Sequence, residues 1–109
     1  TAILDHNKIQ QDGFIEEGGI TLEPLEEKFL SFGWAITRVN GHDVEELIEA
    51  FKWAQTIKDK PQIIIADTIK GYGVSYMEND PKWHGTTPPE KDLFDLAMKE
   101  LTEQEESII

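Results

Sequence analysis

The chain contains no cysteine, so a disulfide framework, a thiolate metal site and redox chemistry through sulfur are all excluded. Basic residues are also scarce. Only 10 Lys and Arg stand against 22 Asp and Glu, and the formal net charge is −12. A surface of this sign repels phosphate backbones and anionic membranes, so we expect neither nucleic acid nor a membrane as a partner.

Long apolar runs are absent as well. The longest uninterrupted one is Ile63–Ala66, whereas a membrane-spanning helix needs about 20 apolar residues. No basic leader precedes an apolar stretch at the start. We therefore expect a soluble, unsecreted protein of the cytoplasm. Because the strand-like run Thr1–Asp5 opens the chain without a starting methionine, we also expect the natural protein to begin further upstream.

The residues that are present predict a folded domain. A chain of 109 residues with 39% hydrophobic side chains can bury a modest core. Strand-like runs cover residues 2–5, 34–39 and 62–68. The last of these runs is apolar without alternation, which is typical of a strand buried on both faces and favours parallel pairing.

Helices are predicted between the strands. The first covers residues 24–32, with Pro24 in its first turn and Gly33 at its end. The second follows Asp43, a candidate N-cap with Glu46 three residues further on. The apolar positions of this helix fall on one face: Val44, Leu47, Ile48, Phe51, Ala54 and Ile57.

The alternation of strands and helices predicts an α/β fold with a doubly wound, mostly parallel sheet. Ligands of such sheets bind beyond the carboxyl ends of the strands. Two segments rich in polar residues follow strand ends here: residues 5–13, and the long stretch 70–89. A last helix is predicted from residue 90 to about residue 101, before an acidic tail over residues 102–109.

Asn7 directly follows a buried strand, and its side-chain oxygen can share a hard cation with the carbonyl oxygen of Ile9 if the chain bends between them. Magnesium prefers oxygen ligands and usually takes one or two carboxylates. Two neutral ligands would therefore hold it poorly, and a carboxylate must come from elsewhere. On local chemistry alone, a plain polar turn is the favoured interpretation of Asn7 and residues 12–13.

The segment Leu4-Asp5-His6-Asn7-Lys8-Ile9-Gln10-Gln11-Asp12-Gly13 resembles the second half of the thiamine-diphosphate motif of transketolases. The first half, a Gly-Asp-Gly some tens of residues upstream, does not occur in this chain. The resemblance implies that the Asn7 side chain and the Ile9 carbonyl bind Mg²⁺, which clamps the diphosphate of the cofactor. Gln11 departs from the apolar residue of many relatives, so no contact is assigned to it.

A second stretch is similar to the transketolase loop that reaches the cofactor. It contains Lys70-Gly71-Tyr72-Gly73-Val74, Met77-Glu78-Asn79, Trp83-His84-Gly85 and Pro88. The resemblance implies that His84 lies between diphosphate and sugar, donates a hydrogen bond to substrate oxygen and assists proton transfer. It also implies that Lys70 reaches the diphosphate, and that Gly71 and Gly73 allow close approach of the backbone.

Each of these signals is weak alone, because a lone His beside Gly is usually a loop residue and Trp83 more often packs than binds. Together with the junctions Phe32-Gly33-Trp34 and Asn40-Gly41-His42-Asp43, the similarity covers nearly the whole chain. No catalytic role is assigned to His6, expected to flank the turn, or to His42, expected to be solvated before the second helix.

The resemblance therefore implies the C-terminal part of a diphosphate-binding domain, residues 1–109, with residues 70–89 as its active-site loop. The implied reaction is transfer of a two-carbon ketol unit between sugar phosphates, as in the pentose phosphate pathway, with thiamine diphosphate and Mg²⁺ as cofactors. A pyrimidine-binding domain from the same chain, a C-terminal subunit or a dimer mate completes such a site, in a homodimer or heterotetramer. The chain is not expected to be a complete catalyst.

Two kinds of alternative remain open from the sequence. One is a deoxyxylulose-phosphate synthase or another transketolase-like enzyme that uses the same cofactor, although residues 9–13 favour transketolase. The other is a non-catalytic α/β interaction module that kept the fold and lost the cofactor. The sequence upstream of Thr1 discriminates between them, because it would contain or lack the first half of the motif.

Overall fold

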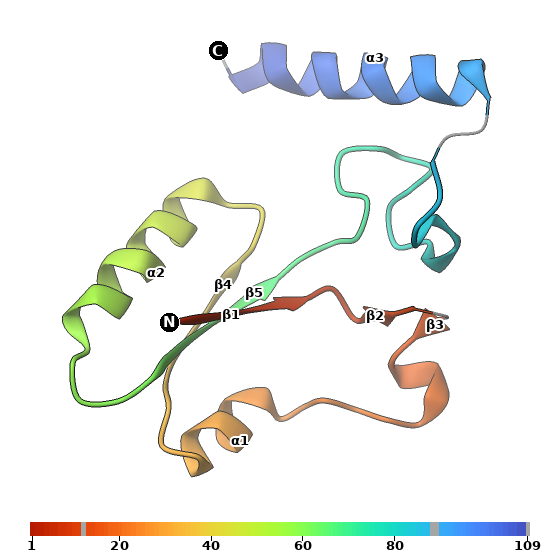
Figure 1. Cartoon of the computed structure of the whole chain (residues 1–109). Helices are drawn as coiled ribbons and strands as arrows, with labels where there is room; N and C mark the ends of the chain where they lie inside the picture. Colours follow the sequence, from red (N-terminus) through yellow and green to blue (C-terminus); the bar gives the residue numbers. More distant parts are fainter. Residues whose placement is uncertain (12, 88–89, 109) are drawn as a thin grey trace. The chain divides into compact units, whose positions relative to one another are not determined.

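The computed structural model of the chain describes residues 1–11, 13–87 and 90–108. The chain forms two compact units. The first unit contains residues 1–8 and 19–68, and the second unit contains residues 9–18 and 69–109. Figure 1 labels the helices and strands of both units.

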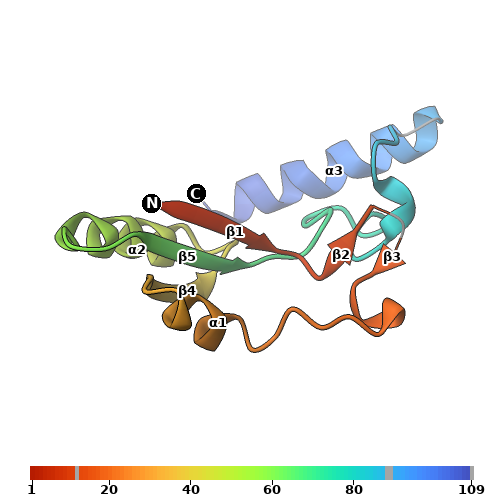
Figure 2. The same ribbon diagram turned by 60° about the horizontal axis from the view of Figure 1, so that its bottom comes forward.

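The first unit contains a three-stranded parallel sheet with the strand order β1-β5-β4. Figure 2 shows β5 between the other two strands. The bounds are Ala2–His6 for β1, Ala35–Asn40 for β4 and Gln62–Asp67 for β5. The three predicted strands and their parallel pairing are therefore confirmed, with small shifts at their ends.

The central strand β5 is buried on both faces, as its unbroken apolar run predicts. Ile64 and Ile65 are 0% exposed, and their neighbours Ile63 and Ala66 are also buried. Full burial of one such isoleucine side chain contributes about 1.5–3 kcal/mol. This strand therefore anchors the sheet whose edge carries Asn7.

Two helices cover the sheet of the first unit. Helix α1 spans Leu25–Ser31, and its Leu25 packs against Ile63 and Ile65 on one face. Helix α2 spans Val44–Thr56 and contacts β4 and β5. Figure 1 shows the two helices on opposite faces of the sheet. The first unit is thus doubly wound, and the predicted fold class is confirmed.

The ends of α1 follow the sequence closely. Gly33 has a φ of +81°, and its N–H donates to the carbonyl of Leu30 at 2.9 Å, so glycine ends the helix as predicted. Pro24 occupies the N-cap rather than the first turn. The carboxylate of Glu23 accepts a hydrogen bond from the N–H of Leu25 at 2.8 Å and satisfies one donor at the start of the helix.

Helix α2 begins at the predicted cap. The Asp43 side chain accepts hydrogen bonds from the N–H groups of Glu45 and Glu46 at 2.9 and 3.0 Å. The Glu46 carboxylate does not return to Asp43 but accepts from the N–H of Asn40 at 2.7 Å. It therefore ties the helix start to the end of β4.

The predicted apolar face of α2 is only partly correct. The buried residues are Ala50 and Ala54, whereas Val44, Ile48 and Phe51 are 68%, 47% and 43% exposed. Small side chains allow a helix to approach a sheet closely, and the rotation that brings the alanines inward turns these larger residues outward.

The second unit contains elements that the sequence did not predict. Strand β2, Ile9–Gln10, pairs antiparallel with β3, Gly13–Phe14. Two short 3-10 helices, η1 at Glu16–Gly18 and η2 at Pro81–Trp83, both contact β3. Strands of two residues are too short to show an alternating pattern, so sequence periodicity could not find them.

Helix α3 spans Lys91–Ile108 and is longer than predicted, because the expected acidic tail continues it. Glu and Gln are good helix formers, and Lys99 lies 3.7 Å from Glu103 one turn further on. Three predicted features include residues outside the described part of the chain: the Asp12–Gly13 turn, Pro88 at the end of the loop, and the tail's last residue, Ile109. Across the described residues, no helix combines the length and the apolar character that a membrane span requires.

Candidate functional site

The carboxyl ends of the three parallel strands meet at one edge of the first unit's sheet. The register places His6 beside Asp67, and Asp67 beside Asn40. Backbone pairing continues past the strands, since the N–H of Thr68 donates to the carbonyl of His6 at 3.4 Å. The N–H of Gly41 donates to the carbonyl of Asp67 at 2.8 Å. The residues that leave this edge are therefore held in fixed positions.

Gly41 is required where the chain leaves β4. A Cβ atom at this position would lie 2.4 Å from Cγ2 of Thr68 and 3.1 Å from the carbonyl oxygen of Asp67. Two carbon atoms of different residues do not approach each other to 2.4 Å, so a Cβ at position 41 would clash with Thr68. The glycine thus permits the chain to cross closely over the end of β5.

Asn7 follows β1 directly and is half-buried. The next residue, Lys8, has a φ of +62°. Residues other than glycine rarely adopt this left-handed conformation, which costs them about 1–2 kcal/mol. The bend that the sequence analysis required for a shared cation is therefore present at Lys8.

The four predicted site residues are divided between the two units. Asn7 belongs to the first unit, whereas Ile9, Lys70 and His84 belong to the second. The structure therefore describes Asn7 separately from the other three.

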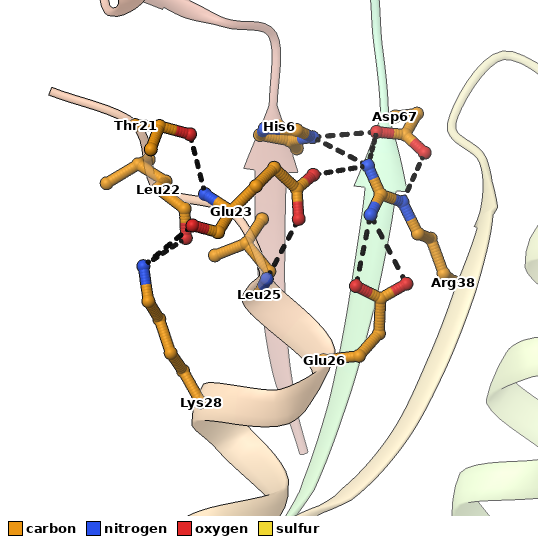
Figure 3. A network of polar contacts seen from close by, with 9 residues as sticks. All are labelled: His6, Thr21, Leu22, Glu23, Leu25, Glu26, Lys28, Arg38 and Asp67. Atoms are coloured by element: carbon orange, nitrogen blue, oxygen red, sulfur yellow. Dashed lines mark hydrogen bonds and ion pairs between the residues drawn. The ribbon is translucent and has the colours of Figure 1, made fainter. Parts of the chain in front are cut away.

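A network of charged side chains lies on the α1 side of this sheet edge, and sequence analysis missed it (Figure 3). Arg38 of β4 is its centre. Its Nε and Nη2 donate to both carboxylate oxygens of Asp67 at 2.7 and 2.9 Å. Nη2 also donates to Glu23 at 2.9 Å, and Nη1 donates to Glu26 at 3.1 and 3.2 Å. One guanidinium on β4 thereby joins carboxylates from β5, from the loop before α1 and from α1 itself.

His6 completes the network and corrects a prediction. Its side chain is only 6% exposed, and its Nδ1 lies 2.7 Å from Oδ1 of Asp67 and 3.3 Å from Nη2 of Arg38. One ring nitrogen cannot donate and accept at once, so the shorter contact assigns the Nδ1 hydrogen to the bond with Asp67. His6 is therefore a buried strand residue within the network and does not merely flank the turn.

The network changes the acidity of its members. Hydrogen bonds from Arg38 lower the pKa of Asp67 to about 2. The pKa of Glu23 is also lowered, first by the N–H of Leu25 and then by Arg38. The same carboxylates raise the pKa of Arg38 above its ordinary value, with Asp67 as the largest cause. Arg38 and Asp67 are therefore both charged at neutral pH.

In the second unit, the predicted active-site loop is closed by its own backbone. The carbonyl of Lys70 accepts a hydrogen bond from the N–H of Asn79 at 3.0 Å. Between them, Gly71 has a φ of +74°, and a Cβ there would lie 2.5 Å from the carbonyl oxygen of Met77. Val74 is buried, with 7% of its surface exposed. The loop is thus a compact turn around a small apolar centre.

Both loop glycines lie in close contact with other segments of the chain. Gly71 lies against Met77. The N–H of Gly73 donates to Glu78 at 3.0 Å, and its carbonyl accepts from Nε2 of Gln104 at 2.8 Å. The expectation that these glycines open the backbone to a diphosphate therefore finds no support in their geometry.

His84 ends η2, and its side chain is exposed. Its N–H donates to the carbonyl of Pro81 at 3.0 Å, while the Asp80 side chain caps the helix through the N–H of Lys82 at 3.0 Å. The backbone around His84 is fixed while its imidazole is open to solvent. This combination allows the ring to meet a ligand.

Trp83 anchors this short helix. Its Nε1 donates to the carbonyl of Tyr76 at 2.9 Å, and the two rings meet edge to face with their centroids 5.2 Å apart. The Tyr76 hydroxyl in turn donates to the carbonyl of Leu93 in α3 at 2.9 Å. Trp83 is therefore a packing residue, as its type alone suggested.

The magnesium ligands that the resemblance implies, Asn7 and Ile9, stay a prediction. Asn7 and Ile9 provide neutral oxygens, and the bend at Lys8 separates them. Within residues 1–11, 13–87 and 90–108, no group of three or more His, Cys, Asp or Glu side chains is arranged to hold a metal. Magnesium usually takes one or two carboxylates, so the two neutral oxygens alone would hold it poorly.

A parallel α/β unit with polar segments beyond its strand ends has the architecture of a cofactor-binding enzyme domain. Sequence comparison gives the family. The family described as "Transketolase, thiamine diphosphate binding domain" matches residues 1–105, and the chain belongs to this family. The match includes both the Asn7 bend and the loop with His84.

Individual relatives agree with this result. The chain is 36% identical over 107 residues to one subunit of the apulose-4-phosphate transketolase of Phocaeicola vulgatus, covering 98% of this chain and 37% of the relative. It is 37% identical to human transketolase-like protein 2, covering 94% of this chain and 16% of that protein. A crystal structure of transketolase from Campylobacter jejuni superposes with a TM-score of 0.76 at 30% identity, covering 89% and 15% of the two chains.

These comparisons also define how much of a transketolase the chain represents. It spans 37% of the Phocaeicola vulgatus relative and 15% of the Campylobacter jejuni chain. The chain is thus similar to part of a thiamine diphosphate binding domain.

Proposed function

We propose that this chain forms the diphosphate and magnesium side of the active site in a transketolase made of two different subunits. The match over residues 1–105 carries the proposal, because it includes both polar segments at once. The relatives support the split arrangement. Those from Phocaeicola vulgatus, Actinobacillus succinogenes and Clostridium are each named as one subunit of a transketolase.

The proposed reaction is transfer of a two-carbon ketol unit from a ketose to an aldose. Two of the relatives are named for apulose 4-phosphate and one for 6-deoxy-6-sulfo-D-fructose. These sugars share an anionic group, a phosphate or a sulfonate. We therefore expect the donor to be a ketose with an anionic group, and sugar phosphates are the first class to test.

Each site residue receives one role in this proposal. Thiamine diphosphate, when bound, supplies the carbon that carries the two-carbon unit. Asn7 and Ile9 provide oxygen ligands for the Mg²⁺ that holds the diphosphate, and Lys70 provides a positive charge to the diphosphate. His84 donates a hydrogen bond to substrate oxygen and helps to move a proton near neutral pH.

The partner follows from the missing half of the site. A pyrimidine-binding subunit contributes the residues that contact the other end of the cofactor, so the active site lies at an interface between subunits, in a heterotetramer. In this proposal the acidic ligand for magnesium comes from a Gly-Asp-Gly segment of the enzyme, which the printed sequence does not contain. The lack of cysteine agrees with a cytoplasmic location, which stays a prediction.

The test uses the complete enzyme, meaning the full-length protein that contains this chain together with its partner subunit. Transfer from a panel of ketose phosphates to aldose phosphates is measured with and without thiamine diphosphate and Mg²⁺. We expect transfer only when both subunits and both cofactors are present. Full activity of this protein without its partner would refute the split arrangement, and an enzyme that binds no thiamine diphosphate would refute the proposed function.

A further inference from the structure

All three nitrogens of the Arg38 guanidinium bind carboxylates at the sheet edge that precedes Asn7. A guanidinium has five N–H donors. Its three nitrogens make five contacts with carboxylate oxygens: two with Asp67, one with Glu23 and two with Glu26. Figure 3 shows these carboxylates around one planar group. Lysine cannot reproduce this arrangement, because its ammonium is a point charge with three donors.

The position of the network in the sheet explains what it fixes. Apolar residues fill the face beneath α1, where Ala2, Ile63 and Ile36 form one row across the strands. The corresponding row at the carboxyl ends of the strands is polar, because His6 lies beside Asp67 there. The network is therefore the last layer of this face before the chain leaves the sheet.

A continuous chain of contacts runs from Arg38 to Asn7. Arg38 holds the Asp67 carboxylate with two bonds, the same carboxylate accepts from the His6 ring at 2.7 Å, and the next residue after His6 is Asn7. His6 is 6% exposed, so its ring has little freedom to move. The direction in which the backbone leaves β1 is therefore coupled to the geometry of the guanidinium.

Stability alone is a weak reason for such a network. Arg38 is 28% exposed and its carboxylates are 40–41% exposed, and ion pairs this open to solvent contribute about 1 kcal/mol or less each. Three carboxylates around one guanidinium also repel one another. What the arrangement supplies is fixed geometry, because the planar fork accepts few alternative positions of its partners.

We propose that Arg38 is a positioning residue for the magnesium and diphosphate site: through Asp67 and His6 it fixes the end of β1 and with it the ligand Asn7. The inference rests on the proposed function, and it extends the site to a side chain that touches neither metal nor cofactor. Residues that orient metal ligands typically change metal affinity 10- to 100-fold when they are removed.

The test compares two variants of one strand in the complete enzyme. Arg38→Met removes the guanidinium and keeps an apolar stem. Ile36→Val is the control, because residue 36 lies on the same face of β4, packs against the core and takes no part in the network. Removal of its methylene costs about 0.5–1.5 kcal/mol. Arg38→Lys serves as a milder variant that keeps the charge if Arg38→Met does not fold.

Three measurements separate positioning from stability. Melting temperature of the cofactor-free enzyme reports stability, and calorimetry gives the dissociation constants of Mg²⁺ and thiamine diphosphate well below that temperature. Hydrogen–deuterium exchange of peptides that contain Asn7 reports the strand end without any ligand. We expect Arg38→Met to raise the dissociation constants at least tenfold and to speed exchange at Asn7, with a smaller effect of Arg38→Lys. Ile36→Val should lower the melting temperature and leave both other readouts unchanged.

Two outcomes would overturn the inference while the proposed function stands. One is a parent enzyme that binds thiamine diphosphate and an Arg38→Met variant that binds it within twofold. The other is an Ile36→Val variant that loses as much affinity as Arg38→Met, since the effect would then follow stability alone. A parent enzyme that binds no thiamine diphosphate would instead overturn the proposed function, and this inference with it.

Discussion

Replacement of Gly71 by alanine should open the loop that carries His84 far more than the same replacement at Gly85. Both glycines have left-handed backbones, with φ of +74° and +71°. Alanine in that conformation costs about 1–2 kcal/mol at either position. The two positions differ in the room that they leave for a Cβ atom. A Cβ at Gly71 would lie 2.5 Å from the Met77 carbonyl oxygen, whereas a Cβ at Gly85 would meet nothing within 4 Å.

The steric cost of a Cβ at position 71 can be estimated from substitutions that insert extra atoms into a well-packed site. Contacts of this kind typically destabilise a protein by about 1–3 kcal/mol, because the backbone must shift. The N–H of Asn79 donates to the carbonyl of Lys70 at 3.0 Å and closes the same loop. Since about 1.4 kcal/mol corresponds to a factor of ten, this amide should exchange roughly 5- to 150-fold faster in Gly71→Ala than in Gly85→Ala.

The assay is hydrogen–deuterium exchange on peptides that contain Asn79, with the complete enzyme and without cofactor. Because both variants share the backbone cost, their difference isolates the contact with Met77. Equal exchange rates in the two variants would refute the description of this loop as closed around its own glycine.

Three further predictions test other parts of the molecule. Asn7→Ala in the complete enzyme should weaken magnesium-dependent cofactor binding with little change in melting temperature; unchanged affinity in calorimetry together with a large drop in melting temperature would make Asn7 a structural turn residue. Ile65→Ala should destabilise the protein by about 2–5 kcal/mol, because this side chain is 0% exposed, whereas Ile3→Ala, at a side chain 57% exposed, should cost far less; similar melting temperatures for both would contradict the central place of β5. The pKa of Asp67 is about 2 in the folded protein, below its ordinary value near 4. The ionised carboxylate therefore adds to the free energy of unfolding in full above about pH 4, and this stabilisation is lost as the pH falls toward 2. Solvent screening at 40% exposure reduces this contribution to about 1 kcal/mol, so the gap in melting temperature between the parent and Asp67→Asn should narrow from pH 7 to pH 3, and a constant gap would contradict the assignment.

The sheet could be predicted from the sequence because its signals are local. The run at residues 62–67 is apolar without alternation, and Gly33 and Asp43 mark the end of one helix and the start of the next. The side of α2 that faces the sheet could not be predicted. Both the alanines and the larger apolar residues recur at helical spacing, and only the tertiary packing selects Ala50 and Ala54.

The Arg38 network shows a different limit. Its partners Glu23 and Asp67 lie 15 and 29 residues from Arg38 along the chain. Asp67 meets Arg38 because β4 pairs with β5, and Glu23 meets it because the following helix α1 packs against β4. The sequence pattern gives neither arrangement. A charged residue inside a strand was the available signal. Such a residue does not by itself indicate which carboxylates it binds.

For the candidate site, the structure gives local geometry, and the roles of its residues stay predictions. The bend after Asn7 follows from a polar segment at a strand end, and the structure has it at Lys8. The loop glycines were expected to let the backbone approach the diphosphate, and the close contacts that the structure shows for them are with the chain. Here Gly71 lies against Met77.

The role of His84 is the most direct test of the account, because an exposed loop residue and a group that meets substrate predict opposite results. In the complete enzyme at saturating thiamine diphosphate and Mg²⁺, His84→Ala should lower turnover by about a hundredfold or more, the usual scale for acid–base groups. His42→Ala, the same change in the turn before α2, serves as the control and should leave turnover nearly unchanged. Melting temperatures of both variants should match the parent. Near-normal turnover and Michaelis constants for His84→Ala, measured with donor and acceptor sugars varied separately, would contradict the proposed site.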